Sequence, residues 1–259
     1  MRTITDHIGR QVTCPTEPKR IISICPAITE TLFALEAEEQ LVGRTKYCIF
    51  PKGQVEKLTA VGGTKEVKID IIQQLQPDLI LAEKEENTEE IVKQLEQIAP
   101  VFVAEVQSIA DGYRLITTLG MLTNRKEKAT ELAAASEAGF HALTKQERGR
   151  AAYVIWRKPY MVVGATTYIN DVLGWLGFDN PFAQREGRYP SVSKEQFQEA
   201  QLDVLFLASE PFPYSEKYIA EFQAFLPNTK IILVDGEMFW YGAKMVEATV
   251  YFTELAKQL

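Results

Sequence analysis

The segment DIIQQLQPDLI at residues 70–80 aligns without gaps with EQFQEAQLDVL at residues 195–205. Each segment starts with an acidic residue in a short helical pattern, continues through a turn to an aspartate, and ends in an apolar strand. One copy in each half of a 259-residue chain predicts two similar lobes, each with its own sheet. The length agrees, because such a chain exceeds the usual size of one hydrophobic core.

Short apolar runs recur along the chain, each followed by loop residues and a helical pattern. This alternation is typical of parallel strands covered by helices, so we expect an α/β protein with two Rossmann-like lobes. The predicted strands are Ile21–Ile24, Asp78–Leu81, Val101–Val103, Ala152–Ile155, Val204–Leu207 and Ile231–Val234.

The alternation breaks in the middle of the chain, where helical patterns at about 108–122 and 126–147 follow one another. The second pattern has an apolar stripe at three-and-four spacing and no proline, which predicts a helix roughly 30 Å long. We interpret it as a single long connecting helix. The predicted division is an N-terminal lobe at 1–124, the helix at 125–147 and a C-terminal lobe at 148–259. The alternative is a crossover helix within one doubly wound domain.

Composition excludes some functions. The net charge is −7 and no Lys/Arg cluster is present, which disfavours a nucleic-acid partner. No apolar run approaches the roughly 20 residues that span a bilayer. The N-terminal residues contain no apolar signal core, so we expect either a removed leader or a cytosolic protein. Three cysteines without CxxC spacing indicate buried thiols, with a Cys25–Cys48 bridge as the alternative.

Ligands of parallel α/β sheets bind beyond the carboxyl ends of the strands. Aromatic residues and prolines follow the predicted strands of the second half, a composition suited to stacking on a large flat ligand. Arg157 and Arg188 would meet acidic substituents. The alternative is that these aromatic rings pack together under the loops. The candidate ligand-binding residues are Pro26, Ala27, Tyr47, Glu83, Trp156, Arg157, Tyr168, Tyr189, Glu210, Phe212, Phe239 and Trp240.

Asp70 and Glu195 begin the two repeated helices, where the helix dipole favours an acidic side chain. Ser193 is the predicted N-cap of the second helix, with Gln196 completing a capping box. Equivalent acids on two lobes would form a spaced pair able to meet two basic sites on a two-fold symmetric partner.

Motifs for catalysis are missing from the sequence: it has no GxGxxG, no GxxxxGK[ST] and no GxSxG. We therefore expect no catalytic residues and no intrinsic cofactor. The only histidines, His7 and His141, lie in the terminal arm and on the long helix. Since zinc and manganese sites usually contain several imidazoles, we expect no protein metal site. A carried metal would be held by its own organic chelate.

The opening Asp6-His7-Ile8-Gly9-Arg10, then Arg20-Ile21-Ile22-Ser23 and Pro26-Ala27-Ile28-Thr29-Glu30, resembles the start of mature substrate-binding proteins of iron-siderophore and vitamin B12 importers. The resemblance continues through residues 76–80, 176–182 and 189–195. It implies a class III periplasmic binding protein with the helical-backbone metal receptor fold. It also implies an extracytoplasmic monomer that delivers its ligand to an ABC permease dimer, with Asp70 and Glu195 docking onto permease arginines.

The resemblance implies a metal chelate bound in the cleft between the lobes, namely a cobalamin or other corrinoid, a ferric siderophore, or haem. B12-binding members place tryptophans where this sequence has Gly63-Thr64 and Glu83-Lys84. The ligand therefore stays open. Two other functions are also open: an enzyme on the same fold with Glu210 or Glu237 as acid or base, and a cytosolic corrinoid- or tetrapyrrole-binding module without a transporter.

Overall fold

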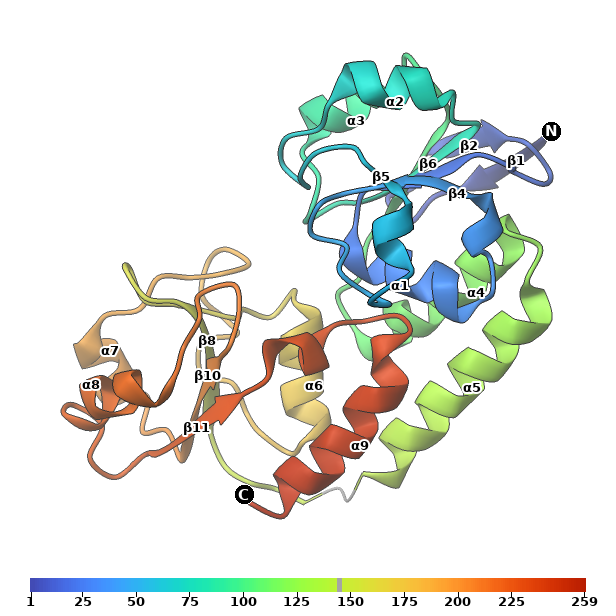
Figure 1. Cartoon of the computed structure of the whole chain (residues 1–259). Coiled ribbons are helices and arrows are strands. Elements are labelled where there is room, and N and C mark those ends of the chain that lie inside the picture. The colour runs from blue at the N-terminus through green and yellow to red at the C-terminus, as the bar shows by residue number, and fades with distance from the viewer. Residues whose placement is uncertain (144–145) are drawn as a thin grey trace. The chain divides into compact units, whose positions relative to one another are not determined.

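A computed structural model describes residues 1–143 and 146–259 and divides the chain into two compact units (Figure 1). Unit 1 contains residues 1–105 and 113–135, and unit 2 contains residues 106–112 and 136–259. A five-stranded sheet forms the centre of unit 1, and a four-stranded sheet forms that of unit 2. The two-lobed α/β fold class is confirmed, while the predicted lobe boundaries stay a prediction.

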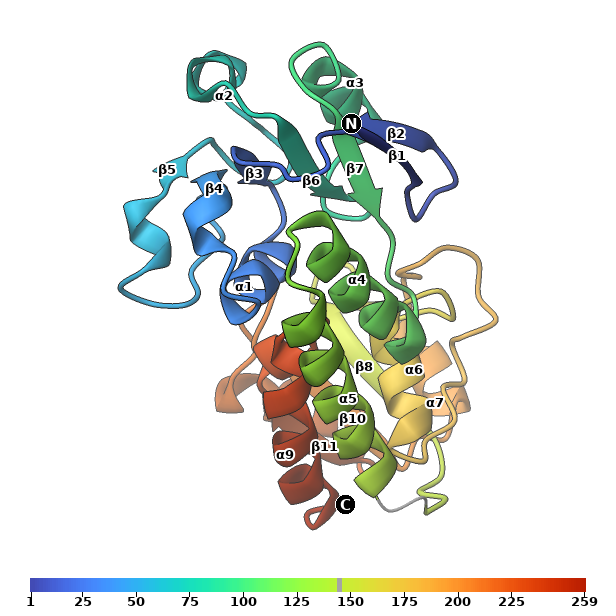
Figure 2. The same cartoon turned by 90° about the vertical axis from the view of Figure 1, so that its right-hand side faces the viewer.

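The sheet of unit 1 is parallel throughout, with the strand order β5-β4-β3-β6-β7. Helices α2 and α3 cover one face, and α1 and α4 cover the other (Figure 1). The hairpin β1–β2 lies beside β7 (Figure 2), where the His7 N–H donates to the Val103 carbonyl at 3.1 Å. The elements are β1 (Arg2–Thr5), β2 (Gln11–Cys14), β3 (Ile21–Ser23), α1 (Pro26–Ala34), η1 (Glu38–Gln40), β4 (Leu41–Arg44), η2 (Val55–Lys57), β5 (Thr59–Ala60), α2 (Ile69–Leu75), β6 (Leu79–Glu83), α3 (Glu89–Leu95), β7 (Val101–Ala104) and α4 (Ile109–Leu122).

The sheet of unit 2 has the order β11-β10-β8-β9, and its edge strand β9 is antiparallel to β8. Helices α7 and α8 cover one face, and α6 and α9 cover the other (Figure 1). Phe197 and Phe222 fill the core on the α7–α8 side, and Phe252 packs on the opposite side. The elements are β8 (Ala151–Trp156), β9 (Met161–Val162), α6 (Tyr168–Trp175), α7 (Lys194–Glu199), β10 (Val204–Ala208), η3 (Glu216–Tyr218), α8 (Ile219–Gln223), β11 (Lys230–Val234), η4 (Gly236–Phe239) and α9 (Lys244–Ala256).

The long connecting helix is α5 (Lys126–Ala142), which contributes residues to both units. Its 17 residues correspond to a length of about 25 Å. The helix ends at Ala142, so the predicted extension to 147 was wrong. Residues 144 and 145 of that extension lie outside the described residues, and 146 and 147 are not helical. Before β8 begins at Ala151, the Arg148 N–H donates to the Gly177 carbonyl at 2.8 Å. Gly149 follows at φ +83°, where a Cβ would lie 2.1 Å from an Asp203 carboxylate oxygen.

The internal repeat extends to backbone conformation. Both α2 and α7 carry their acidic residue in the first turn, and each is followed by a left-handed glutamine: Gln76 has φ +46° and Gln201 has φ +48°. Two residues later comes an aspartate and then a fully buried strand, β6 or β10. A non-glycine residue in this conformation is uncommon, so its recurrence at equivalent positions supports the repeat.

The repeated aspartates hold the amino ends of paired strands. The Asp78 carboxylate accepts the backbone N–H groups of Lys19 at 2.7 Å and Arg20 at 3.0 Å, just before β3. The Asp203 carboxylate accepts the Arg150 N–H at 2.7 Å, just before β8. Because β3 pairs with β6 and β8 pairs with β10, each carboxylate joins the starts of two neighbouring strands. The repeat predicted from the sequence is confirmed.

Replacing Asp78 or Asp203 with alanine should lower the free energy of unfolding by about 1–2 kcal/mol, because each change removes charge-assisted bonds to backbone N–H groups. Urea unfolding followed by circular dichroism measures the change. Glu199→Ala, on an exposed position of α7, is the matched control and should leave the midpoint in place. Parent-like stability of both aspartate variants would contradict the assigned role.

Candidate functional site

The strand-end surface of unit 2 consists of the loops that follow β8, β10 and β11, at 157–160, 209–214 and 235–241. Trp156, the last residue of β8, is 42% exposed and makes an edge contact with Phe212 at 5.9 Å between ring centroids. Phe212 in turn contacts Tyr214 at 4.7 Å and Tyr218 at 5.3 Å. The rings after β8 and β10 therefore form one connected group whose outer member is exposed.

Arg157 is engaged by an acidic partner within unit 2. Its guanidinium donates to the Glu221 carboxylate of α8 at 2.7 and 3.0 Å, and the Tyr160 hydroxyl donates to the same carboxylate at 2.5 Å. Burial and then this bond raise the pKa of Tyr160 to about 12. The Arg188 guanidinium donates to the Val106 carbonyl at 3.3 Å. Binding of an acidic ligand group by Arg157 would compete with Glu221, so this role stays a prediction.

The loop after β11 divides its aromatic residues between the core and the surface. Phe239 is 3% exposed and packs against Tyr153 at 4.7 Å between ring centroids. Its neighbour Trp240 is only partly buried, and the Trp240 indole N–H donates to the Glu210 carboxylate of the loop after β10. The predicted aromatic surface and the alternative of rings packed under loops thus both occur here, in adjacent residues.

The remaining candidates in unit 2 are less exposed than Trp156. Tyr168 is the first residue of α6, where Thr167 caps the helix; it is 3% exposed and contacts Tyr241 at 5.8 Å between ring centroids. Tyr189 is partly buried, in the segment before α7. Contact of either residue with a ligand stays a prediction.

The strand-end surface of unit 1 consists of the loops after β3, β4, β5 and β6. Pro26 and Ala27 form the first turn of α1 directly after β3, and Ala27 is buried. Tyr47 follows β4 and is 52% exposed, with the Lys46 ammonium 5.1 Å from the centre of its ring. A Cβ on Gly63 would lie 3.1 Å from this ring, so the ring rests against the backbone after β5. Tyr47 is the exposed aromatic residue of this surface.

Glu83 ends β6 inside the protein, at 1% exposure. Its carboxylate accepts the backbone N–H groups of Glu85 at 2.7 Å and Glu86 at 3.0 Å. Burial is the largest cause that raises the pKa of Glu83 to about 7. The Asn87 side chain joins this loop to its neighbours, because its amide donates to the carbonyls of Ile24 at 3.2 Å and Thr64 at 2.9 Å. The geometry gives Glu83 a role in ordering the loop, and its predicted ligand contact stays untested.

Asp70 and Glu195 are exposed at equivalent positions of α2 and α7. The predicted capping box of Ser193 and Gln196 is confirmed. The Ser193 hydroxyl, as the largest cause, lowers the pKa of Glu195. Each unit therefore presents one exposed acid in the first turn of its repeated helix, as the docking prediction requires, although no contact tests that prediction.

The histidines contact neighbouring side chains, and the cysteines are buried. The His7 ring is 3.2 Å from the Thr118 hydroxyl, and exposed His141 contacts Trp175 edge-on at 5.3 Å between centroids. All three cysteines are buried and none of them is in a disulfide, so the Cys25–Cys48 bridge is absent. Within residues 1–143 and 146–259, no three His, Cys, Asp or Glu side chains group as a metal site. None of the helices in these ranges has the length and apolarity to cross a membrane.

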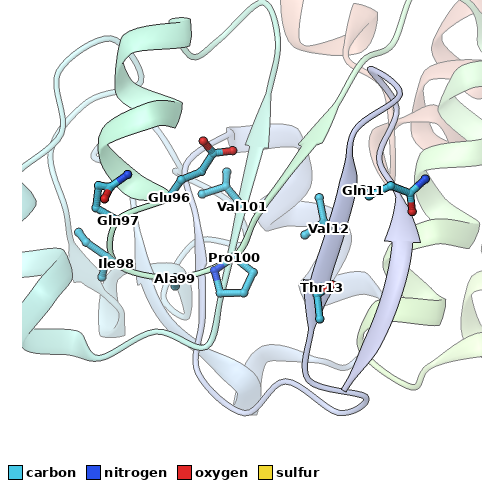
Figure 3. Close-up of a pocket in the computed structure, with 9 residues that line it drawn as sticks. All are labelled: Gln11, Val12, Thr13, Glu96, Gln97, Ile98, Ala99, Pro100 and Val101. Atoms are coloured by element: carbon cyan, nitrogen blue, oxygen red, sulfur yellow. The ribbon is translucent and has the colours of Figure 1, made fainter.

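Pockets within the units lie away from these surfaces. A cavity of about 410 Å³ in unit 1 is lined by Gln11–Thr13 of β2 and by Glu96–Val101, at the start of β7 (Figure 3). A cavity of about 550 Å³ in unit 2 includes Trp175 and Gly177, near the end of α6. Neither is lined by a residue predicted from the sequence to bind a ligand.

Sequence reasoning missed the partners that hold the site loops. Glu221 binds Arg157 from 64 positions away, and no local pattern marks it. Asn87 is not among the predicted residues, although a buried side-chain amide just after a strand commonly bonds to neighbouring backbone groups. The predicted strand-end loops are present, and several of the bonds that order them involve residues outside the predicted set.

Known proteins show the same organisation. A family model described as "Periplasmic binding protein" matches residues 21–229. The vitamin B12-binding protein of Vibrio parahaemolyticus is 28% identical over 203 residues, covering 75% of this chain and 73% of that protein.

Two solved structures from Vibrio cholerae share the fold at low identity. The vitamin B12 binding protein BtuF has a TM-score of 0.79 at 22% identity, with 94% of this chain and 98% of that chain covered. The heme binding protein HutB has a TM-score of 0.75 at 20% identity, with 91% and 98% covered. The chain belongs to the periplasmic binding protein family.

Proposed function

We propose that this protein captures a preformed metal chelate with the strand-end surfaces of its two units and delivers it to an ABC permease. The observation that carries the proposal is the aromatic group at the strand ends of unit 2, where Trp156 is exposed and Trp240 is partly buried. Aromatic faces bind large flat ligands at little cost in side-chain entropy. The relatives named for vitamin B12 and heme support a cobalt corrinoid or a haem as the ligand, and a ferric siderophore is the third candidate from the sequence resemblance.

Exposure separates two kinds of residue at these surfaces. Trp156, Phe212 and Trp240 of unit 2 and Tyr47 of unit 1 retain accessible ring surface, and we assign them contact with the chelate. Glu83 is buried, with its carboxylate bonded to its own loop, and we assign it the ordering of that loop. The protein acts as a binding protein without a catalytic step.

The partner assigned to Asp70 and Glu195 is a permease dimer with two basic sites. Both acids are exposed and occupy the same position of a repeated helix, so a two-fold symmetric partner meets the same kind of carboxylate from each unit. The protein is a monomer that works outside the cytoplasmic membrane, where such a permease receives its ligand.

A ligand panel tests the function directly. Cyanocobalamin, dicyanocobinamide, haemin and a ferric siderophore are added separately, and the thermal midpoint is measured. The true ligand at 100 times its dissociation constant should add about 2.7 kcal/mol to the free energy of unfolding. Trp156→Ala should reduce this gain, while Val250→Ser on exposed α9 should preserve it. A panel without any shift would count against a metal-chelate ligand.

Removal of the exposed acids should separate docking from capture. In Asp70→Asn/Glu195→Gln, ligand affinity should match the parent, whereas association with the cognate permease in proteoliposomes should weaken about ten-fold through loss of charge complementarity. Ligand-stimulated ATP hydrolysis at increasing protein concentration measures this. Glu199→Gln on α7 is the control for an exposed acid of the same helix. Unchanged stimulation by the double variant would remove the docking assignment.

The buried carboxyl of Glu83 should make stability depend on pH. Because burial raises its folded pKa from 4.5 to about 7, the folded state binds this proton more tightly than the unfolded state. The protonated Glu83 carboxyl therefore contributes to the free energy of unfolding. This contribution is fully present below the unfolded pKa of Glu83 and is lost as pH rises through about 7. Glu83→Gln should shrink the difference in unfolding free energy between about pH 5 and pH 8 by about 2 kcal/mol.

Urea unfolding at both pH values measures that difference, with Glu66→Gln in the neighbouring exposed loop as the control. A glutamine oxygen still accepts backbone N–H groups, so the change removes the titration and keeps the shape of the side chain. The same pH dependence in Glu83→Gln and the parent would show that Glu83 does not titrate in this range.

A further inference from the structure

Trp240 and Glu210 come from different loops of the unit 2 strand-end surface and bond to each other. The Trp240 indole N–H donates to a Glu210 carboxylate oxygen. A partly buried indole N–H needs an acceptor, and an ionised carboxylate provides a stronger one than a neutral group. This bond restricts rotation of the indole ring relative to the loop after β10.

The backbone beneath this bond is fixed by further contacts. The Gly236 N–H donates to the Ser209 hydroxyl at 2.9 Å, and the Asp235 carboxylate caps the turn by accepting the Glu237 N–H at 3.1 Å. The backbone N–H of Trp240 donates to the Glu237 carbonyl at 3.1 Å. Phe239, between turn and indole, is anchored in the core. These contacts hold the backbone at Trp240 in place. The bond to Glu210 then orients the Trp240 side chain.

Gly236 allows Glu210 to approach. A Cβ at position 236 would lie 2.4 Å from the Glu210 Cγ and 3.2 Å from its backbone nitrogen. Real Cβ atoms do not come that close, so any larger residue would displace the Glu210 side chain. Burial, and then the nearby charge of Glu210, raises the pKa of Tyr153.

We propose that Glu210 is a positioning residue that holds the Trp240 indole ready for the ligand. The inference rests on the proposed function, because it deepens the role of the unit 2 strand-end surface. A ring that is ordered before binding loses less rotational freedom when the ligand arrives. Glu210 then contributes to affinity through Trp240 and makes no ionic contact with the ligand.

The ligand-independent test uses indole signals in NMR spectra of the ¹⁵N-labelled full chain. The chain has three tryptophans, so three indole N–H signals are expected, and Trp240→Phe identifies one of them. In Glu210→Ala, the Trp240 signal alone should move upfield and exchange faster with solvent. Glu210→Gln should restore most of the shift, because its amide oxygen still accepts the N–H. Gly236→Ala should act like Glu210→Ala while keeping the carboxylate.

The ligand test uses cyanocobalamin and haemin, titrated separately by tryptophan fluorescence. For the probe that binds, the dissociation constant should rise about ten-fold in Glu210→Ala and by at most about two-fold in Glu210→Gln. An unmoved Trp240 signal in Glu210→Ala overturns the inference. So does a Glu210→Gln variant that keeps the signal yet loses as much affinity as Glu210→Ala, because Glu210 would then contact the ligand itself.

The two tests separate this inference from the proposed function. If the Trp240 signal responds as expected but neither probe binds the parent, the positioning by Glu210 is supported and these two chelates are removed as ligands. Unmoved signals of the other two tryptophans in each variant show that the protein is still folded.

Discussion

Each sheet depends on an aspartate carboxylate that accepts backbone N–H groups at the start of the neighbouring strand: Asp78 in unit 1 and Asp203 in unit 2. In the first sheet the bond lies immediately before the first residue pair of the ladder, in which Ile21 lies opposite Leu79. Once the starts of parallel strands are joined, their carboxyl ends emerge at the same opposite edge. The aspartate contacts thus lie at one edge of each sheet, and the loops with the candidate ligand contacts lie at the other.

Much of this architecture could be predicted because local sequence patterns indicate it. Fully buried parallel strands such as β6 and β10 read as continuous apolar runs, and the capping box of α7 is a short motif. Strand β4 escaped prediction because Gly43 and Arg44 interrupt its apolar run. Strands β5 and β9 have two residues each, too few for any period. The end of α5 was placed too late because no proline marks it in the sequence.

The site was predictable in position and not in detail. Strand-end loops follow from the order of strands, but the burial of each side chain depends on partners distant in sequence. Phe239 and Trp240 are adjacent and equally aromatic, yet only Phe239 meets Tyr153 and enters the core. Likewise, no sequence pattern near Arg157 predicts its ion pair with Glu221 of α8. Tertiary packing determines which side chains are buried and which partners they bind, and the local sequence pattern does not show this.

The charged groups of the strand-end surfaces are largely satisfied within the protein. The Glu83 carboxylate receives backbone N–H groups, Glu210 receives an indole N–H, and Arg157 pairs with Glu221. Breaking such a contact to bind an ion would leave a partly buried charge without its partner, which is costly. Recognition through aromatic faces requires no such exchange. The surfaces therefore favour a bulky ligand that demands contact area from the protein rather than charge.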